Sequence, residues 1–386
     1  MKRQRSHSSS RGNIKTHVRF MFKGIRGGDP VFLGTLITLI LFGLIMLTSA
    51  SSALGQYEHK DSFYYLKHQV FNGIILGTFA FIFMSTVNYR VWKKNAFALL
   101  IVSIVMLLLV FTPLGASALG ASRWIDIGSF NFQPSEMVKL TFLLYLAAWF
   151  ERKGRHIEDS TYSFLPFMAL LGTLVLIIAG AQQDLGTMTV IASIAIGMYF
   201  VAGAQLKHMA AIAGIGAAAV ATLVVIAPYR IARITTFLHP ESTNTLGEGY
   251  HIIQALIAIG SGGLFGVGLG HSLQKYSYVP EVATDSIFAI ISEELGFLFS
   301  FGLVALYIVL LWRMLRIARN AQDLFGKYVV LGITVWIGFQ AFVNIGAMLS
   351  MWPLTGIPLP FISFGSTSLI MLLAACGLVH NISRRS

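Results

Sequence analysis

Long apolar windows alternate with short charged segments along the chain beyond residue 30. A helix needs about 20 predominantly apolar residues to cross the hydrocarbon core of a bilayer, and this pattern supplies them repeatedly. We therefore predict an all-α integral membrane protein with about ten transmembrane helices. The predicted spans are 31–54, 66–88, 94–113, 134–151, 163–181, 185–203, 207–228, 286–312, 326–351 and 362–383.

Two stretches between spans are informative. The charge-free window from Tyr328 to Ile382 is divided by WPLTGIPLP, whose prolines and glycine cannot continue a helix. Residues 229–285, between the seventh and eighth spans, are too long to be a simple connection. Within them, GYHIIQALIAIG has apolar residues at helical spacing, which predicts a short helix lying on the bilayer surface.

Composition supports the membrane class. Of the 386 residues, 55% are hydrophobic and 11% are charged, whereas a soluble domain carries about 25% charged residues. The first apolar run ends in SASSALG, which resembles a signal-peptidase site, but the run is too long for a signal peptide, and we interpret it as a retained span. The single cysteine, Cys376, cannot form an internal disulfide and is expected to pack as a small hydrophobic residue.

The distribution of basic residues predicts the orientation. With ten spans, both termini share one side, which receives 21 of the 28 lysines and arginines and a net charge of +16, against −4 for the remainder. Basic loops stay in the cytoplasm, so we predict cytoplasmic termini and an extracytoplasmic loop at 229–285. The net charge of +12 for the whole chain is therefore explained by membrane topology, and it does not indicate nucleic-acid binding. Residues 1–30 are predicted to be a disordered basic tail near anionic lipid, and 31–386 the membrane domain.

Four of the sixteen acidic residues fall within fourteen positions after the glycine-rich stretch that begins at Gly262, namely Glu281, Asp285, Glu293 and Glu294. Ionisable groups at a membrane edge are costly unless paired or hydrated, which makes them candidates for function. Asp285 is either the N-cap of the eighth span or a general base. Glu293 and Glu294 lie about 12 Å deeper on an unbroken helix. Neither can therefore pair closely with Asp285, and each contacts either a neighbouring span or the substrate.

Cations and polar residues elsewhere on the predicted outer face are further candidates. Arg123 beside Trp124 suits phosphate or sugar recognition, or an interfacial anchor. Lys275 either neutralises a phosphate or extends its amine to the interface. Glu136 and Lys139 are i,i+3 neighbours that are expected to pair within the membrane.

Two further motifs contain candidate site residues, and two patterns that would indicate a metal or a dinucleotide site are absent from the sequence. Asp184, in QQDLGT, favours a helix cap or turn over a ligand. Ser363 lies in PLPFISFGSTS, where small polar residues pack helices or bind a headgroup. The histidines show no metal-binding pattern. The GxGxG from Gly266 to Gly270 follows no strand, which argues against a dinucleotide site.

Together these segments resemble the SEDS family (shape, elongation, division and sporulation), over nearly the whole chain after residue 30. The matching motifs are GASRWIDIG with FQPSEMVKL, QQDLGT, GEGYHIIQALIAIGSGGLFGVGLGHSLQKYSYVPE, TDSIFAIISEELG and PLPFISFGSTS. The loop GLGHSLQKYSYVPE resembles the FtsW branch, because the GTQ-type sequence of the RodA branch is absent. Gln183, Ala283 and Ser286 depart from the Pro, His and Phe that are usual in the family.

The resemblance implies a peptidoglycan glycosyltransferase that polymerises lipid II at the outer face of the bacterial cytoplasmic membrane during cell division. It implies Asp285 as the catalytic base that takes the proton of the acceptor's 4-hydroxyl. It also implies a class B penicillin-binding protein and other division proteins as partners. No cofactor is assigned, and Arg123, Lys275 or a divalent cation such as Mg²⁺ or Mn²⁺ would stabilise the leaving diphosphate.

Two other functions stay open. A lipid II flippase would be expected to show inverted repeats and half-helices, which the sequence does not reveal. A non-catalytic division scaffold would leave the buried acids unexplained.

Overall fold

The computed structural model describes residues 27–113, 115–118, 121–128, 130–226, 248–276 and 278–385. Most of the predicted N-terminal tail and residues 227–247 of the long loop lie outside these ranges. The helices are α2 (Pro30–His59), α3 (Tyr64–His68), η1 (Gln69–Ile75), α4 (Leu76–Thr86), α5 (Tyr89–Leu109), α6 (Pro134–Lys153), η2 (Gly154–Glu158), η3 (Ser160–Phe164), α7 (Leu165–Val175), η4 (Leu176–Ala181), α8 (Leu185–Val201), α9 (Leu206–Ile226), α11 (Glu248–Ser261), α12 (Ile287–Arg319), α13 (Leu324–Met348) and α14 (Ser366–Ser383).

A helix occupies each of the ten predicted spans, which confirms the helical membrane class. Within the described ranges, seven helical segments are long and apolar enough to cross a membrane. Helices α6, α8 and α9 are not among the seven, so the count of ten spans stays a prediction. Helix α5 begins at Tyr89 instead of residue 94, because the Asn88 side chain caps it by accepting a hydrogen bond from the amide of Arg90 (3.1 Å).

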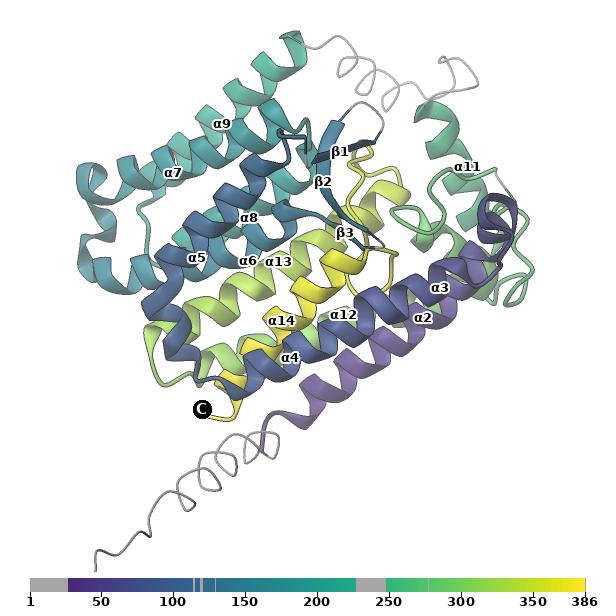
Figure 1. The fold of residues 1–386 in the computed structure, drawn as a ribbon, viewed down its shortest axis with the longest axis horizontal. Helices are drawn as coiled ribbons and strands as arrows, with labels where there is room; N and C mark the ends of the chain where they lie inside the picture. Colours follow the sequence, from purple (N-terminus) through teal and green to yellow (C-terminus); the bar gives the residue numbers. More distant parts are fainter. Residues whose placement is uncertain are drawn as a thin grey trace, which may run out of the picture.

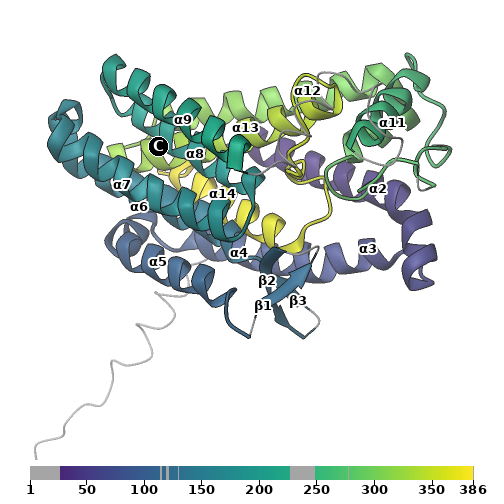
Figure 2. The same cartoon turned by 90° about the horizontal axis from the view of Figure 1, so that it is seen from above.

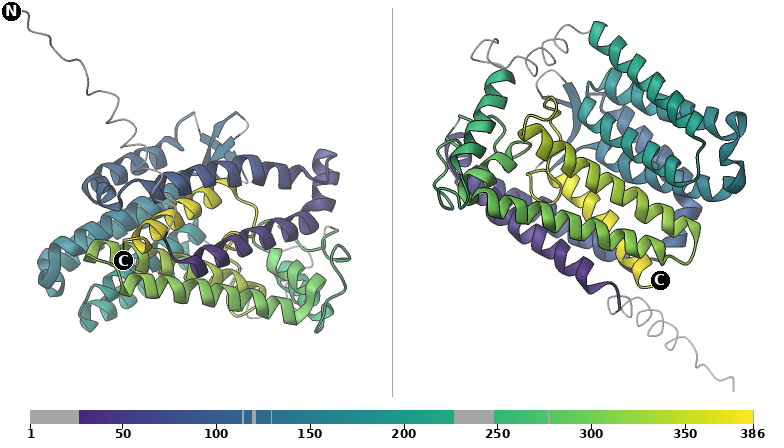
Figure 3. Two further views of the ribbon diagram at one scale, coloured as in Figure 1. Left: turned by 90° about the horizontal axis from the view of Figure 1, so that it is seen from below. Right: turned by 180° about the vertical axis from the view of Figure 1, so that it is seen from behind.

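The last helix, α14, lies in the middle of the bundle. It packs along α4 and also contacts α5, α6, α12 and α13, and its yellow ribbon is enclosed by other helices in Figures 1 and 2. In its apolar window 78% of the residues are buried, compared with 22% for the span formed by α3, η1 and α4. The two described ends of the chain meet at one end of the bundle, where the amide of Asp29 donates to the hydroxyl of Ser383 (3.4 Å) (Figure 3).

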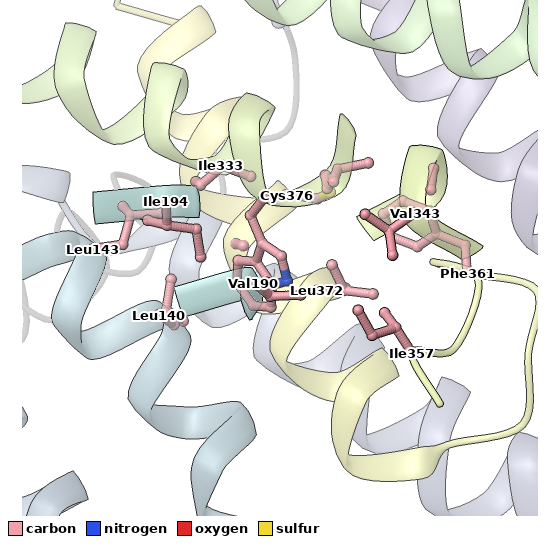
Figure 4. Packing of buried hydrophobic residues seen from close by; sticks show 14 of the residues in the cluster. Leu140, Leu143, Val190, Ile194, Ile333, Val343, Ile357, Phe361, Leu372 and Cys376 are labelled. Carbon is pink, nitrogen blue, oxygen red and sulfur yellow. The ribbon is translucent and has the colours of Figure 1, made fainter. Parts of the chain in front are cut away.

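The hydrophobic core extends through the bundle, and part of it lies where α13 packs against α6, α8 and α14. Figure 4 shows Leu143 of α6, Ile194 of α8, Ile333 of α13 and Cys376 of α14 among the buried residues of this core. Cys376 is a fully buried free cysteine, which confirms that it packs as a small hydrophobic residue. Close-packed protein interiors tolerate volume changes poorly. These four helices therefore form a rigid base for the loop between α13 and α14 and for the segment before α12.

A small antiparallel sheet, absent from the prediction, lies before α6. Strands β1 (Gly115–Ala118), β2 (Ala121–Ile127) and β3 (Phe130–Phe132) pair in the order β1–β2–β3. Ile125 of β2 lies opposite Gly115 on one side and Phe132 on the other. Aromatic and β-branched residues favour strands, but these strands are short and interrupted by glycine and serine, which obscures the sequence pattern.

Helix α12 is broken, contrary to the expectation of one continuous span. Gly296 has φ 76° and ψ −174°, which no residue in a regular helix adopts. A half-helix of residues 287–295 therefore precedes the longer segment 297–319. The break leaves backbone groups without intrahelical partners, and these must be satisfied by another part of the chain.

The glycine-rich loop before α12 supplies those partners. The four hydrogen bonds are Val267 N to Glu293 O (3.0 Å), Gly268 N to Glu294 O (3.0 Å), Phe297 N to Gly263 O (2.9 Å) and Leu298 N to Leu264 O (3.2 Å). A side chain at Gly266 would lie 2.1 Å from the carbonyl oxygen of Glu294, and this glycine has φ +80°. Close backbone approach and positive φ therefore explain the GxGxG sequence.

Candidate functional site

The segment before α12 carries Asp285, and its backbone is fixed by the loop that leads into α14. The carbonyl of Ala283 accepts a hydrogen bond from the amide of Phe364 (2.8 Å). The carbonyl of Thr284 accepts one from the hydroxyl of Ser363. Ser363, predicted to contact substrate, thus holds the residue next to Asp285 in place.

Two buried amide side chains extend this framework. Asn344, on α13, donates to the carbonyls of Asp285 (2.7 Å) and Ile357 (2.8 Å). Gln69, in the π-helical segment η1, donates to the carbonyl of Ser363 (3.2 Å) and accepts from the amide two residues further on (3.1 Å). Sequence reasoning missed both residues. The available signal was a lone amide side chain in an apolar window, which is costly unless it has hydrogen-bond partners.

The Asp285 carboxylate is half-buried and is not the cap of α12. Ser286 occupies the N-cap position, and its side chain makes no capping hydrogen bond. The hydroxyl of Thr284 donates to one Asp285 carboxylate oxygen (3.2 Å), and a Cβ at Gly356 would lie 4.0 Å from the other. The carboxylate therefore faces the loop between α13 and α14, and the N-cap hypothesis is wrong.

Glu293 and Glu294 are buried and bind different partners. Glu293 accepts hydrogen bonds from the hydroxyl of Ser272 and from the following backbone amide (3.0 Å). Glu294 accepts from the hydroxyl of Ser49 on α2 (2.6 Å) and forms an ion pair with Lys275 (3.0 Å). The expected contact of Glu294 with a neighbouring span is confirmed. Lys275 is only 3% exposed, so it does not reach the interface, and its charge is compensated within the protein.

A second cluster joins β2 to the start of α8. The guanidinium of Arg123 donates to the carbonyls of Gln182 (3.2 Å) and Gln183 (2.7 Å). The carboxylate of Asp184 accepts from the amide (2.9 Å) and the hydroxyl (2.8 Å) of Thr187, which confirms its role as a helix cap. Both recorded partners of the Arg123 guanidinium are neutral, so its positive charge is not cancelled by these contacts.

The first turns of α6 hold the predicted pair of Glu136 and Lys139. Their charged atoms lie 2.6 Å apart and both side chains are buried, which confirms the pairing, and the Lys139 amine also lies 5.4 Å from the ring centre of Trp336. Buried polar atoms normally have partners. Several in this neighbourhood have none among the described residues, namely Glu136 Oε2, Ser135 Oγ, Ser368 Oγ and both side-chain amide atoms of Gln182.

The loop between α13 and α14 passes both the helix start capped by Asp184 and the Asp285 carboxylate. A Cβ at Gly186, in the first turn of α8, would lie 2.6 Å from the carbonyl oxygen of Thr355. The next residue of that loop, Gly356, faces Asp285. The helix start capped by Asp184 and the Asp285 carboxylate are therefore in contact with successive loop residues, whereas the Lys275–Glu294 pair belongs to the helix break.

Helix α11 supplies a residue that sequence reasoning missed. The predicted short helix is present, and Nε2 of its buried His251 lies 2.6 Å from the hydroxyl of Ser286, the residue after Asp285. Burial lowers the pKa of His251 to about 4, so the ring is neutral at neutral pH. This neutral hydrogen bond docks α11 against the start of α12.

The described part of the chain contains no site at which protein side chains alone would bind a metal ion. No three His, Cys, Asp or Glu side chains there converge as ligands. Mg²⁺ is commonly bound by one or two carboxylates together with substrate phosphates. A divalent cation here would therefore need ligand oxygens from the substrate, and its involvement stays a prediction.

The family model of FtsW, RodA and SpoVE, described as cell cycle protein, matches residues 30–386. The chain belongs to this family. The FtsW/RodA/SpoVE match covers the whole membrane domain, including both clusters described above.

Curated relatives align with the FtsW/RodA/SpoVE chain over nearly its full length. Stage V sporulation protein E of Bacillus subtilis (strain 168) is 44% identical over 362 residues, which cover 93% of this chain and 98% of the relative. The probable peptidoglycan glycosyltransferase FtsW of Geobacter sp. (strain M18) is 37% identical over 365 residues, which cover 94% and 98%. The sequence therefore resembles both FtsW and the sporulation protein.

Solved structures share the fold. A peptidoglycan synthase complex, studied for the coordination of polymerization and crosslinking, has a chain that matches with a TM-score of 0.74 at 28% identity, covering 92% of this chain and 98% of that one. The rod shape determining protein RodA of Thermus thermophilus matches with a TM-score of 0.65 at 27% identity, covering 93% and 98%.

Proposed function

We propose that this chain is a peptidoglycan glycosyltransferase that polymerises lipid II, with Asp285 as the general base. Its glycosyltransferase class is supported by the family and by relatives named as probable peptidoglycan glycosyltransferases. The observation that carries the role of Asp285 is the framework around it. Three consecutive carbonyls, of residues 283–285, are each held by a donor from the α13–α14 region, while the carboxylate remains half-buried.

The chemistry follows from that placement. The acceptor's 4-hydroxyl attacks the anomeric carbon of the donor sugar and forms the new glycosidic bond. Its proton passes to the Asp285 carboxylate, and the bond from the anomeric carbon to the diphosphate oxygen breaks. Undecaprenyl diphosphate leaves with the electron pair. A rigid backbone keeps the base in position, which matters because general-base catalysis requires hydrogen-bond reach to the proton transferred.

The second cluster offers binding groups for the polar part of lipid II. Arg123 retains its charge and can bind a phosphate through two parallel N–H groups. The partnerless buried atoms of Glu136, Ser135, Ser368 and Gln182 favour a polar ligand or water at the outer ends of α6, α8 and α14. Together with Trp124 and Lys139, these residues are proposed substrate contacts. Lys275, Glu293 and Glu294 instead support the loop that leads to Asp285.

The partner and location belong to the same proposal. Because a solved relative is a chain of a peptidoglycan synthase complex, we infer a class B penicillin-binding protein as the partner that crosslinks the product. The protein is a multi-pass membrane protein, which we assign to the bacterial cytoplasmic membrane at the division septum, with both termini in the cytoplasm.

The decisive experiment measures glycan polymer made from lipid II by the purified protein with its partner. Asp285→Asn should lower the rate about 10²–10⁴-fold, the usual cost of losing a general base. Asp126→Asn, which changes an exposed aspartate of β2 in the same way, is the control and should retain activity. Polymerisation at the wild-type rate by Asp285→Asn would exclude Asp285 as the base.

One structural observation favours the flippase alternative and calls for a test beside this one. Broken helices are common in transporters, and α12 is broken at Gly296. The backbone of residues 263–268 hydrogen-bonds to the groups exposed at this break, which indicates a structural role for the break and not a transport site. Lipid II movement across vesicles by both wild type and Asp285→Asn, without polymer from either, would identify a flippase.

A further inference from the structure

A cavity of about 410 Å³ lies at the end of the bundle opposite the Asp285 site. Helix α12, with its 33 residues, separates Asp285 before its first turn from Asp323 beyond its last turn. The lining side chains come from α5, α6 and the turn before α13. They are Arg90, Lys93, Lys94, Phe97, Ala148, Arg152 and Asp323.

Two of the four cations in this basic cavity are already paired. The guanidinium of Arg90 lies 3.1 Å from the carboxylate of Asp323, which also caps α13. The amine of Lys93 lies 2.5 Å from the carboxylate of Glu151 on α6. These two ion pairs hold α5 against α6 and against the start of α13, and each pair has no net charge.

The other two cations, Lys94 and Arg152, have no carboxylate within ion-pair distance among the described residues. Lys94 is exposed, and the Nε of Arg152 donates to the carbonyl of Ala148 (3.2 Å), which orients the guanidinium while leaving its charge uncompensated. The cavity therefore presents about two net positive charges, one of them on a planar group that binds phosphate oxygens in pairs.

The remaining wall is apolar and open to the outside of the bundle. Phe97 is 60% exposed, and its ring packs only partly, against Tyr145 of α6 at 6.1 Å between centres. An inorganic phosphate would gain nothing from this phenyl ring. A molecule with an anionic head and a hydrocarbon chain would use both parts of the cavity.

We propose that this basic cavity binds the headgroup of an anionic phospholipid from the surrounding leaflet. The phosphodiester lies between Lys94 and Arg152, and an acyl chain follows Phe97 into the bilayer. Basic pockets between transmembrane helices are suited to such headgroups, and each cation near the membrane surface adds favourable energy.

The test titrates the purified full-length protein in detergent with phosphatidylglycerol or phosphatidylcholine of identical acyl chains and counts bound lipids by native mass spectrometry. Wild type should bind one phosphatidylglycerol at least tenfold more tightly than phosphatidylcholine. The double variant Lys94→Gln, Arg152→Gln should bind it about 25-fold more weakly, roughly fivefold for each cation. The swap Lys94→Arg, Arg152→Lys keeps both charges and should retain the binding.

The control removes two charges elsewhere at the same end of the bundle. Lys207→Gln with Arg319→Gln changes exposed residues that do not line the cavity, and should leave lipid binding unchanged. Equal weakening in the control would show general charge attraction and overturn the proposal. Displacement of the lipid by equimolar inorganic phosphate would overturn the assignment to a lipid. Equal melting temperatures of all variants establish that they are folded.

Discussion

The buried ion pair of Lys275 with Glu294 makes Lys275 a structural residue first. Lys275→Ala would leave the Glu294 carboxylate buried without its cation, which typically costs about 3–5 kcal/mol. We therefore expect less folded protein and a lower melting temperature in detergent, measured by size-exclusion chromatography and thermal denaturation.

The matched control breaks an ion pair at the surface. Lys67→Ala removes the partner of Asp61, a pair at 2.7 Å whose side chains are 58% and 36% exposed, and should hardly change the melting temperature because solvent screens this pair. Replacing both buried partners, by Lys275→Met with Glu294→Gln, should recover much of the stability. A Lys275→Ala protein as stable as wild type would contradict the structural role.

The neutral state of His251 predicts a pH dependence of the α11 contact. Its pKa is lowered by burial to about 4, against 6.5 for an ordinary histidine. The contact should be fully stable above pH 6.5 and weaken as the pH falls from 6.5 towards 4, by up to about tenfold per pH unit. Protection factors of the α11 amides at pH 7.5 and pH 5, in which hydrogen exchange is corrected for its intrinsic dependence on pH, measure this effect. His251→Gln should make the protection factors less dependent on pH.

The glycine-rich loop packs against the broken helix α12 because glycines such as Gly262 have no side chain at the points where the two backbones meet. A Cβ at Gly262 would lie 1.9 Å from the carbonyl oxygen of Ser292, and backbone cannot move aside as a flexible side chain can. Gly262→Ala should therefore destabilise the protein by about 1–3 kcal/mol or more. Gly260→Ala, two residues earlier and with open space around its Cβ, should be tolerated. Equal melting temperatures for the two variants would disprove this account.

The helices could be predicted because apolar windows and proline-rich breaks are local signals. The break in α12 could not, because Gly296 adopts its conformation only where the loop of residues 263–268 supplies replacement hydrogen bonds. That pairing joins segments about thirty residues apart. The strand β2 escaped prediction for a related reason, since its partners β1 (GASA) and β3 (FNF) are too short to show the alternation of a strand.

The local contacts of the candidate residues could be predicted from the sequence, whereas their partners from distant segments could not. The Glu136–Lys139 pair follows from helical spacing, and the Asp184 cap from its position before an apolar run. The partners of Asp285 come from α13 and from the loop before α14, through Asn344 and Ser363. Contacts between spans this distant in sequence depend on how the bundle packs, which periodicity does not encode.

The separation of charge along the whole molecule predicts its orientation in the membrane. A cysteine introduced at His271, which is exposed in the loop before α12, should react with an impermeant maleimide in intact cells. A cysteine at Arg319, exposed at the far end of α12, should stay protected until the membrane is opened. The buried native Cys376 should contribute little background. Labelling of both positions in intact cells would reject the predicted topology.

The central place of α14 has a consequence for how the protein is made. This helix follows all the other described helices in the chain, yet it packs along α4 and against four others. Until it inserts, earlier spans must remain in the membrane with groups such as Gln69 lacking their final partners. The bundle therefore completes only once α14 has been synthesised, and a chain cut after Gly365 should be removed by membrane proteases although the described spans before α14 are present.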